Sequence, residues 1–337
     1  MNNQQEIVLM RLNSLSMALA ASALLLLPVS AVHAKGSGQI FVSSENDNAV
    51  TVLDGKTYAV VKTIPTGERP RDMRLSTDGQ KLFVIASNSE RVDVIDIARL
   101  AVERSIEVGE DPEMFAFSPD SKRFYVSMEE DAKVSVIDVA AGKKVAEIEV
   151  GEEPEGVMMS PDGKRLYVTS EVANMVHVID TATNEIAANI VVGNRPRRFA
   201  ATPDSSEIWV TNELGGSVTI IDGRKNEIKG TVSFAPKGFR ADDVTPVGIA
   251  MTRDGKTAYV TLGRANHVAV VDVASRAVKE YVLVGQRAWG VTLSRDQSRL
   301  FVVNGLSDDM SIVDTRNNKV LRSVPVGRVP HTAVIDD

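Results

Sequence analysis

Short runs in which apolar and polar residues alternate recur throughout this chain. Two neighbouring examples are KRLYVTS, residues 164–170, and MVHVID, residues 175–180. Both runs are rich in β-branched and aromatic residues and are bounded by turn-forming residues, which is typical of half-buried β-strands. Similar runs fill the chain from residue 39 onward. The pattern therefore predicts an all-β protein.

The runs belong to an internal repeat that has three markers in one register. An apolar residue followed by Asp ends one strand of each repeat, at Asp54, Asp96, Asp138, Asp180, Asp222, Asp272 and Asp314. An aromatic residue opens another strand, at Phe41, Phe83, Tyr125, Tyr167, Trp209, Tyr259 and Phe301. Turn signals such as PDGK, residues 161–164, form the third marker. Both residue series advance by 42 positions, except for one step of 50.

A repeat of this length predicts one blade of a β-propeller, because four short strands fit into about 40–45 residues. Seven repeats therefore predict a seven-bladed β-propeller of four-stranded blades. We expect the aligned aromatic residues to pack between blades. We also expect the Asp at each strand end to accept backbone N–H bonds in the following turn.

The two ends of the repeat region predict how the ring closes. The repeats begin with QIFVSS, residues 39–44, which corresponds to the second strand of a blade. They end with PHTAVID, residues 330–336, which corresponds to a first strand. We therefore expect strands from both termini to complete one blade and to leave no free edge between blades.

The first part of the chain has the features of a secretory leader. The segment LSMALAASALLLLPVSA, residues 15–31, is apolar but short for a membrane span, and small residues surround Ala34. We predict a signal peptide over residues 1–34, a propeller over 35–337, and no membrane span after cleavage. Glu6 is unusual in a leader, so Met10 is an alternative start to Met1. The expected location is the bacterial periplasm.

Composition excludes several kinds of site. The formal net charge is −7 and the chain contains no cysteine. Without cysteine there is no disulfide, thiolate metal site, covalent c-type haem or cysteine nucleophile, so core packing must hold the fold. An acidic exported protein is also a poor candidate for nucleic-acid binding, and we expect no nucleic-acid partner.

The repeats stop agreeing at the position that follows the proline of each innermost strand. That position holds, in chain order, Arg71, Glu113, Glu155, Arg197, Val247, Trp289 and His331. Four aligned glutamates are expected on the same face, namely Glu45, Glu129, Glu171 and Glu213. Arg198 adds to the basic segment VGNRPRRF, residues 192–199. Alternate loops of antiparallel strands share a face, so we place these residues at the mouth of the central channel. The insertion at residues 233–246 could form a flap beside it.

This set of side chains has more than one interpretation. Arg71 and Arg197 could simply neutralise Glu113 and Glu155 in ion pairs. They could also form, with Trp289 as an aromatic wall, a site for a small anionic or polyhydroxyl ligand, because paired arginines grip carboxylates. Glu129 and Glu171 could hold a divalent cation or serve a hydrolase. No histidine ring, phosphate loop or nucleophile elbow is visible, so we assign no catalytic residue, metal or cofactor.

The repeats resemble a known family. WVTN, residues 209–212, and its relatives YVTS, YVTL, FVVN and YVSM resemble the YVTN family of β-propeller repeats. The segments DPEMFAFSPD from residue 111, EPEGVMMSPDGK from 153 and LVGQRAWGVTLS from 283 are similar to an exported branch associated with pyrroloquinoline-quinone-dependent catabolism. The YVTN resemblance implies the propeller fold, and propellers host many unrelated activities.

The resemblance implies a non-enzymatic binding or scaffold protein that serves a periplasmic quinoprotein alcohol oxidation system. Its partners would be a quinoprotein dehydrogenase or a transporter component. The alternative is a lactonase-like hydrolase, since similar seven-bladed propellers resemble sugar lactonases. That enzyme would need a general base at the mouth, for which Glu113, Glu155 and His331 are the candidates.

Overall fold

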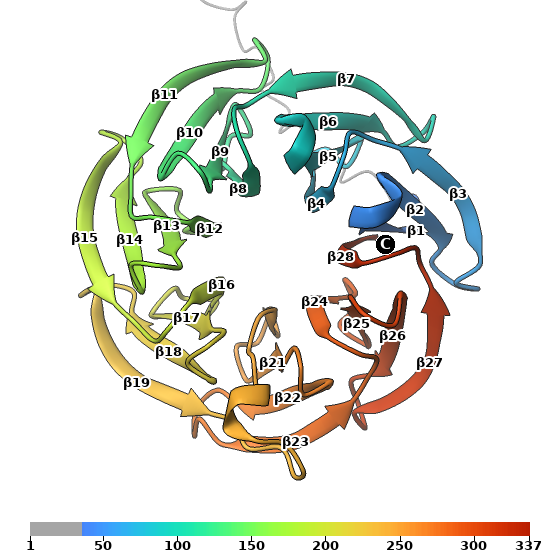
Figure 1. Cartoon of the computed structure of the whole chain (residues 1–337), viewed down its shortest axis with the longest axis vertical. Coiled ribbons are helices and arrows are strands. Elements are labelled where there is room, and N and C mark those ends of the chain that lie inside the picture. Colours follow the sequence, from blue (N-terminus) through green and yellow to red (C-terminus); the bar gives the residue numbers. More distant parts are fainter. Residues whose placement is uncertain (1–35) are drawn as a thin grey trace, which may run out of the picture. The chain divides into compact units, whose positions relative to one another are not determined.

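The computed structural model describes residues 36–337, and these form seven four-stranded antiparallel sheets around a central channel (Figure 1). The predicted all-β, seven-bladed propeller is therefore confirmed. Among the described residues, no helix has the length and apolar character needed to cross a membrane. The expected signal peptide, residues 1–34, lies outside the described part of the chain.

Each blade has the same strand order from the channel outward. The first three blades are β28 (Pro330–Asp336), β1 (Gln39–Ser44), β2 (Ala49–Asp54) and β3 (Val60–Pro65); β4 (Pro70–Leu75), β5 (Lys81–Ala86), β6 (Arg91–Asp96) and β7 (Ala101–Glu107); and β8 (Pro112–Phe117), β9 (Arg123–Met128), β10 (Lys133–Asp138) and β11 (Lys143–Glu149). The next two are β12 (Pro154–Met159), β13 (Arg165–Ser170), β14 (Met175–Asp180) and β15 (Glu185–Val191); and β16 (Pro196–Ala201), β17 (Glu207–Asn212), β18 (Ser217–Asp222) and β19 (Glu227–Ser233). The last two are β20 (Ile249–Met251), β21 (Thr257–Thr261), β22 (His267–Asp272) and β23 (Val278–Leu283); and β24 (Ala288–Leu293), β25 (Arg299–Asn304), β26 (Asp309–Asp314) and β27 (Lys319–Pro325). Three short 3-10 helices are η1 (Glu45–Asp47), η2 (Ser87–Ser89) and η3 (Ala241–Asp243).

The ring closes as the sequence predicts. Strand β28 pairs antiparallel with β1, with Gln39 opposite Asp336 and Ile40 opposite Ile335. Figure 1 shows the C-terminal strand lying innermost in the blade whose other three strands come from the N-terminal side. Segments from the two ends of the described chain therefore share one sheet, and every blade has four strands.

The apolar core is divided into seven clusters, each of which joins two neighbouring blades. For example, Tyr167 of β13 packs with Ile208 and Val210 of β17, and Trp209 of β17 packs with Val260 of β21. All seven aligned aromatic residues are buried in such clusters. The expected packing between blades is confirmed, and burial of apolar area stabilises the ring without disulfides.

The turn at the end of each third strand is held by its aspartate. A carboxylate oxygen of Asp180 accepts hydrogen bonds from the backbone N–H groups of Ala182, at 2.8 Å, and Thr183, at 3.2 Å. The equivalent aspartate accepts at least one such bond in the other six blades. The predicted role of this repeated residue is therefore confirmed, and it fixes the strand-to-strand geometry.

The innermost strands carry a bulge that controls which side chains reach the channel. In six of the seven sheets the register shifts by one residue near the mouth end of the innermost strand; in β16, for example, it shifts between Pro196 and Phe199. A β-bulge places two residues opposite one and re-aims their side chains. Consecutive residues of these strands, such as Arg197 and Arg198, can therefore both serve the channel.

The inserted segment, residues 233–246, packs mainly on the outer strands of its blade. Its Phe239 contacts the His267 ring edge-to-face at 5.5 Å between centroids, and Phe234 and Val244 are buried in an inter-blade cluster. The backbone N–H of Ala235 donates to the hydroxyl of Tyr281. At the end of the segment, the hydroxyl of Thr245 accepts a hydrogen bond from the backbone N–H of Arg264, in the loop between β21 and β22. Apolar side chains therefore hold most of the insertion over strands β22 and β23, and its action as a flap stays a prediction.

Candidate functional site

A cavity of about 420 Å³ opens at the end of the channel where the innermost strands begin. We call it the mouth pocket. Its lining is dominated by charged side chains, namely Glu45, Arg69, Arg71, Glu129, Glu155, Arg195, Arg197, Glu213, Arg264 and Arg287, together with Trp289. The sequence-based placement of a charged site near the mouth therefore agrees with the geometry of these residues.

The seven residues that follow the aligned proline form a buried layer beneath the mouth pocket. This layer, which we call the floor, contains Arg71, Glu113, Glu155, Arg197, Val247, Trp289 and His331, and each is buried. Four of them line the pocket, whereas Glu113, Val247 and His331 do not. The position that varies between repeats is thus a polar septum across the channel, rather than an open ring of solvated side chains.

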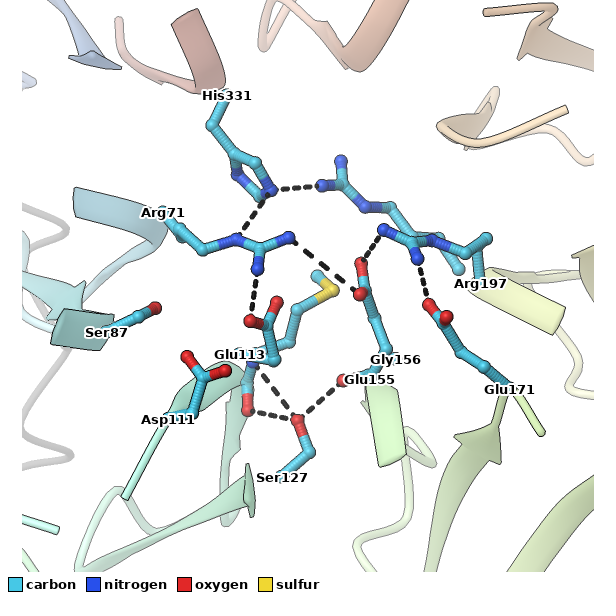
Figure 2. Close-up of polar contacts among 12 residues, drawn as sticks. Arg71, Ser87, Asp111, Glu113, Ser127, Glu155, Gly156, Glu171, Arg197 and His331 are labelled. Carbon is cyan, nitrogen blue, oxygen red and sulfur yellow. Dashed lines mark hydrogen bonds and ion pairs between the residues drawn. The ribbon is translucent and has the colours of Figure 1, made fainter. Parts of the chain in front are cut away.

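Two arginines neutralise the carboxylates of the floor. Figure 2 shows Arg71 and Arg197 approaching Glu155 from opposite sides. Arg197 Nη2 lies 2.8 Å from one Glu155 oxygen, and Arg71 Nη2 lies 3.8 Å from the other. Arg71 also pairs with Glu113, and Arg197 also pairs with Glu171. The ion-pair interpretation of these residues is therefore the one that the geometry favours, and the pairs are buried.

Burial and the neighbouring charges shift the pKa values in opposite directions. Burial opposes the charge on Glu155, but Arg197 and Arg71 outweigh it and lower its pKa below the usual range. Burial raises the pKa of Glu113 well above its usual value against the pull of Arg71, and Glu155 and Glu129 add to the rise. For Arg71, the carboxylates of Glu113 and Glu155 outweigh burial and raise the pKa.

His331 is held as a neutral hydrogen-bond acceptor. Its Nε2 lies 3.0 Å from Nη2 of Arg198 and 3.4 Å from Nε of Arg71. A guanidinium can only donate, so Nε2 must be unprotonated and the proton sits on Nδ1, which lies 2.9 Å from the hydroxyl of Thr332. Burial, with Arg198 and Arg71 close by, lowers the pKa of His331 well below its usual value.

Arg198 does not belong to the mouth pocket. It is the third residue of β16, and its side chain lines a second cavity of about 330 Å³ on the other side of the floor. We call this cavity the lower chamber. The two cavities share no lining residue. The bulge in β16 accounts for the separation, because it turns Arg197 and Arg198 toward different sections of the channel.

A second tier of arginines and glutamates surrounds the mouth pocket. Arg69 Nη1 lies 3.2 Å from Asp111, and its Nε lies 3.5 Å from Glu45. On the opposite side, Arg195 Nε lies 2.7 Å from Glu171 and 3.3 Å from Glu213. These pairs are partly exposed and contribute less than the buried ones. Each of these arginines thus bridges two carboxylates of the ring.

The acidic side chains also approach one another. Carboxylate oxygens of Asp111, Glu113 and Glu129 lie within 4.8 Å of one another, as do those of Glu129, Glu153 and Glu171. Such spacing could hold a divalent cation. However, arginine side chains already pair with members of both groups. Glu129, which belongs to both groups, and Glu153 have no arginine or lysine nitrogen within 4.0 Å among the described residues, so the ion-pair network accounts for only part of the arrangement.

Two arginines of the mouth pocket differ from the others in having no carboxylate partner. Within the described residues, neither Arg264 nor Arg287 has a carboxylate oxygen within 4.0 Å. Arg287 instead lies over the face of Trp289, with its guanidinium carbon 4.4 Å from the ring centroid. The buried indole Nε1 of Trp289 has no hydrogen-bond acceptor among those residues. This side of the pocket therefore lacks close ion pairs, and the carboxylate of Asp243 interacts with Arg264 only at longer range.

Hydroxyl groups of the second strands position the floor, which the sequence analysis did not foresee. Thr169 of β13 donates to the backbone oxygen of Arg197 in the next blade at 3.0 Å, and Ser127 of β9 donates to that of Glu155 at 2.6 Å. Ser43, Thr211 and Thr261 make the equivalent bond to the following blade. Each is the third residue of a YVTN-like motif, so the recurrence of Ser or Thr there was the available signal.

Sequence reasoning placed Arg195 at the mouth, within the segment of residues 192–199, but missed Arg69, Arg264 and Arg287. Arg69, Arg195 and Arg287 directly precede the aligned proline or its alanine replacement, and each has a left-handed backbone with φ of 56°, 54° and 56°. Arg264 lies in the loop between β21 and β22. The position before the proline also varies among repeats, and the same alignment could have identified it. Of the sequence-predicted residues, Glu45, Glu129 and Glu213 line the pocket and Glu171 is buried beside it.

Two family models match this chain. The choice-of-anchor I domain matches residues 130–300, and a YNCE-like β-propeller matches residues 27–117. No curated protein matches. Both matches fall on parts of the repeat region and agree with the propeller architecture.

Solved structures with the same fold show low sequence identity to this chain. Hydrazine synthase from Kuenenia stuttgartiensis is 24% identical with a TM-score of 0.77, over 83% of this chain and 93% of that one. A functionally unknown protein from Desulfotomaculum acetoxidans DSM 771 is 18% identical with a TM-score of 0.76, over 89% and 99%. The dihydro-heme d1 dehydrogenase NirN, in complex with DHE, is 15% identical with a TM-score of 0.68, over 88% and 75%.

Identities below 25% establish a common fold and leave function open. The choice-of-anchor I model, in contrast, covers just over half of the sequence. The seven-bladed ring and this match lead to one conclusion: the chain belongs to the choice-of-anchor I domain family.

Proposed function

We propose that this protein is an exported, non-enzymatic binding protein that recognises a small anionic ligand in the mouth pocket. The observation that carries the proposal is the pair Arg264 and Arg287, which line the pocket without a carboxylate partner in the described chain. Every other arginine of that pocket is already paired. An anion would supply the missing counter-charge.

The surroundings of Arg287 suit a flat or polar anion. Trp289 offers an indole N–H that is buried and has no acceptor, and its ring faces the Arg287 guanidinium. An unmade hydrogen bond of this kind costs free energy, which a ligand oxygen would recover. Charge-assisted bonds from arginine to a carboxylate are stronger than neutral ones. A polyhydroxyl group could accept from the same indole but would leave the charge unbalanced.

The finer proposal is that the protein is an accessory of a periplasmic pyrroloquinoline-quinone-dependent alcohol oxidation system. It is supported by the similarity of the segments starting at residues 111, 153 and 283 to that branch of propellers. Pyrroloquinoline quinone is itself a planar aromatic polycarboxylate, which fits arginines beside an indole. A quinoprotein dehydrogenase or a transporter component is the proposed partner.

Thermal-shift and fluorescence titrations of the mature protein test the ligand proposal. The ligands are pyrroloquinoline quinone, short carboxylic acids, sugar lactones and calcium. Trp209 and Trp289 are the only tryptophans, so a Trp209→Phe background reports on the mouth pocket alone. We expect a carboxylate ligand to raise the midpoint and change Trp289 emission, and Arg264→Ala with Arg287→Ala to remove both effects. Arg240→Ala, an exposed arginine outside the pocket, is the matched control. Equal binding by all variants would overturn the proposal.

The hydrolase alternative rests on Glu155. It is the one candidate base that both lines the mouth pocket and has a lowered pKa, so it is ionised near neutrality. Glu113 and His331 do not line the pocket. Turnover of aldonolactones that is lost in Glu155→Gln, with the variant still folded, would replace the binding proposal by an enzymatic one. No turnover across a lactone panel removes the alternative.

A further inference from the structure

The lower chamber lies beneath the floor and is built by residues that directly follow the floor residues in the sequence. It is lined by the third residue of all seven innermost segments, namely Asp72, Met114, Gly156, Arg198, Gly248, Gly290 and Thr332. Innermost strands run from the mouth toward the opposite face, so Phe117 and Met159, which end their strands, lie nearest that face. The floor separates this chamber from the mouth pocket.

Arg198 is a buried arginine of the chamber that has no close carboxylate partner. Its relative exposure is 9%, and no carboxylate oxygen of the described chain lies within 4.0 Å of its guanidinium. Its one side-chain hydrogen bond goes to the neutral His331, and its buried Nε donates to no atom there. Burial lowers the pKa of Arg198 to about 10. The carboxylates of Glu155 and Asp72 lie beyond 4.0 Å and offset the effect of burial only in part. A buried guanidinium without a directly paired counter-ion is costly, and the cost falls when an anion binds beside it.

The acid that lines the chamber does not fill this role. Asp72 already lies 3.1 Å from Nε of Arg74 and accepts a hydrogen bond from the backbone N–H of Phe115 at 3.3 Å. The charges of Asp72 and Arg74 therefore cancel. Arg198 leaves one uncompensated positive charge among the lining residues, which matches a ligand with a single negative charge.

The rest of the wall combines polar groups with an adaptable apolar part. The apolar part contains Met114, Met158, Met159, Phe117 and Phe199, with Val157, Ile249 and Val291. Methionine side chains adjust to irregular ligand shapes, and such walls bind hydrocarbon. The chamber, at about 330 Å³, falls at the small end of known ligand sites, which span about 300–1,000 Å³.

We propose that the lower chamber binds a small monocarboxylic acid with an apolar body. The carboxylate lies against the Arg198 guanidinium and accepts hydrogen bonds from its free N–H groups. The hydrocarbon part packs on the methionines and phenylalanines. Saturated acids such as hexanoate and octanoate, and aryl acids such as phenylacetate, have this chemistry. The inference does not depend on the mouth pocket, since the two sites share no residue.

Titration calorimetry on the mature wild-type protein, with hexanoate, octanoate and phenylacetate, tests the proposal. Hexanol lacks the charge and adipate carries a second one, so each should bind at least about tenfold more weakly than hexanoate. Arg198→Leu keeps similar bulk and removes the charge; it should weaken hexanoate by about tenfold or more. In the Arg264→Ala, Arg287→Ala double variant, which lacks the unpaired mouth arginines, binding of hexanoate to the chamber should persist, and adding Arg198→Leu should remove it. Undiminished binding by Arg198→Leu would overturn the proposal.

A second measurement keeps the test valid if the Arg198 variant does not fold. Methyl carbon-13 NMR of the methionines in the wild-type protein should show octanoate-dependent shifts for Met114, Met158 and Met159, assigned by Met→Leu substitution. Methionines outside the chamber should not move. Shifts spread over the whole set, or no shift at millimolar octanoate, would refute a chamber site. Arg264→Ala should lose a ligand of the mouth pocket and keep hexanoate binding in the lower chamber. This difference distinguishes failure of the proposed function from failure of the chamber site.

Discussion

The Nη2 atom of Arg198 lies 3.0 Å from Nε2 of His331, in the buried layer that divides the channel. The pair joins residues 133 positions apart in the sequence. It forces the imidazole into one neutral tautomer. A guanidinium only donates hydrogen bonds, so the ring nitrogen that faces it must carry no proton. The polar septum is thus set by a histidine that must remain uncharged.

Stability should therefore fall in mild acid through His331. Its folded pKa lies well below the ordinary value of 6.5, so the unfolded chain takes up a proton that the folded one refuses. The contribution is fully present above pH 6.5 and is lost as pH falls below it. His331→Gln accepts the same bonds through its amide oxygen and does not titrate. Between pH 7.5 and 5, wild type should lose up to about 1.4 kcal/mol per pH unit relative to the variant in urea unfolding. Parallel pH profiles would contradict the neutral assignment.

Breaking the buried ion pairs should cost much more than breaking an exposed one. Arg197→Ala removes the shortest arginine contact of buried Glu155 and one of the two arginine partners of Glu171, so that Arg71 and Arg195 alone remain to pair with them. We expect a loss of about 3–5 kcal/mol in the free energy of unfolding, as for other buried pairs that lose one member. Arg240→Ala breaks a pair with Asp243 in which the arginine side chain is 85% exposed, and it should cost at most about 1 kcal/mol. Similar losses in both variants would show that the septum is solvated.

The hydroxyl of Thr169 should contribute measurably to the ring. It accepts from the backbone N–H of Gly156 at 2.7 Å and donates to the backbone oxygen of Arg197 at 3.0 Å. Thr169→Val keeps the shape and leaves both backbone groups unpaired, so unfolding should become easier by about 1–3 kcal/mol. The same change at exposed Thr77 serves as control. Chemical denaturation of both variants measures the difference, and no difference would deny the positioning role.

Gly156 should tolerate no side chain. A Cβ there would lie 1.9 Å from the backbone oxygen of Arg197. Gly156→Ala must push two innermost strands apart, and overpacking of this kind costs about 1–3 kcal/mol or more. Gly305→Ala is the matched control, because its nearest neighbour would lie 3.7 Å away. Thermal melts should show a clear drop for the first variant alone. An equal drop in both would point to backbone flexibility as the cause.

Removing residues 330–337 should abolish cooperative unfolding of the ring. The deletion takes away β28, exposes the free edge of β1, and removes His331 from the septum. We expect a molecule with a lower melting midpoint and a broad transition, measured by calorimetry. Deletion of residue 337 alone leaves β28 intact and should change little. A truncated protein that melts like the full chain would show that closure does not stabilise the ring.

The repeat register made the architecture predictable, and side-chain detail required the structure. Alignment alone put Tyr167 between blades and Asp180 in its turn, because both tasks recur in every blade. It could not show that the side chain of Arg198 points away from that of Arg197. A β-bulge in β16 sets these directions, and no residue in the sequence of that repeat marks the bulge. Arg197 pairs with Glu155 and Glu171 of the neighbouring blade. The distances between these side chains depend on how closely the ring brings the two blades together, which the alignment of repeats does not give.

The insertion shows a similar limit. The sequence placed it at the face of the mouth, but three apolar residues, Phe234, Phe239 and Val244, hold most of it over the outer strands. Contacts with His267 and Tyr281 on the outer strands supply the burial that the channel mouth, lined by charges, does not offer. The sequence indicated an inserted loop. The strands on which that loop packs can be identified only from the assembled blades.

The position of β28 also has a consequence for the order of folding. This strand is synthesised after every other strand of the ring, yet it pairs with β1, the earliest of them. Neighbouring blades can form on local contacts as the chain emerges, while the last pairing must span almost the whole described sequence. Until then His331 is missing from the floor, and Arg198 and Arg71 lack the ring nitrogen that accepts from them. The molecule therefore completes its central channel only when its last strand meets its first.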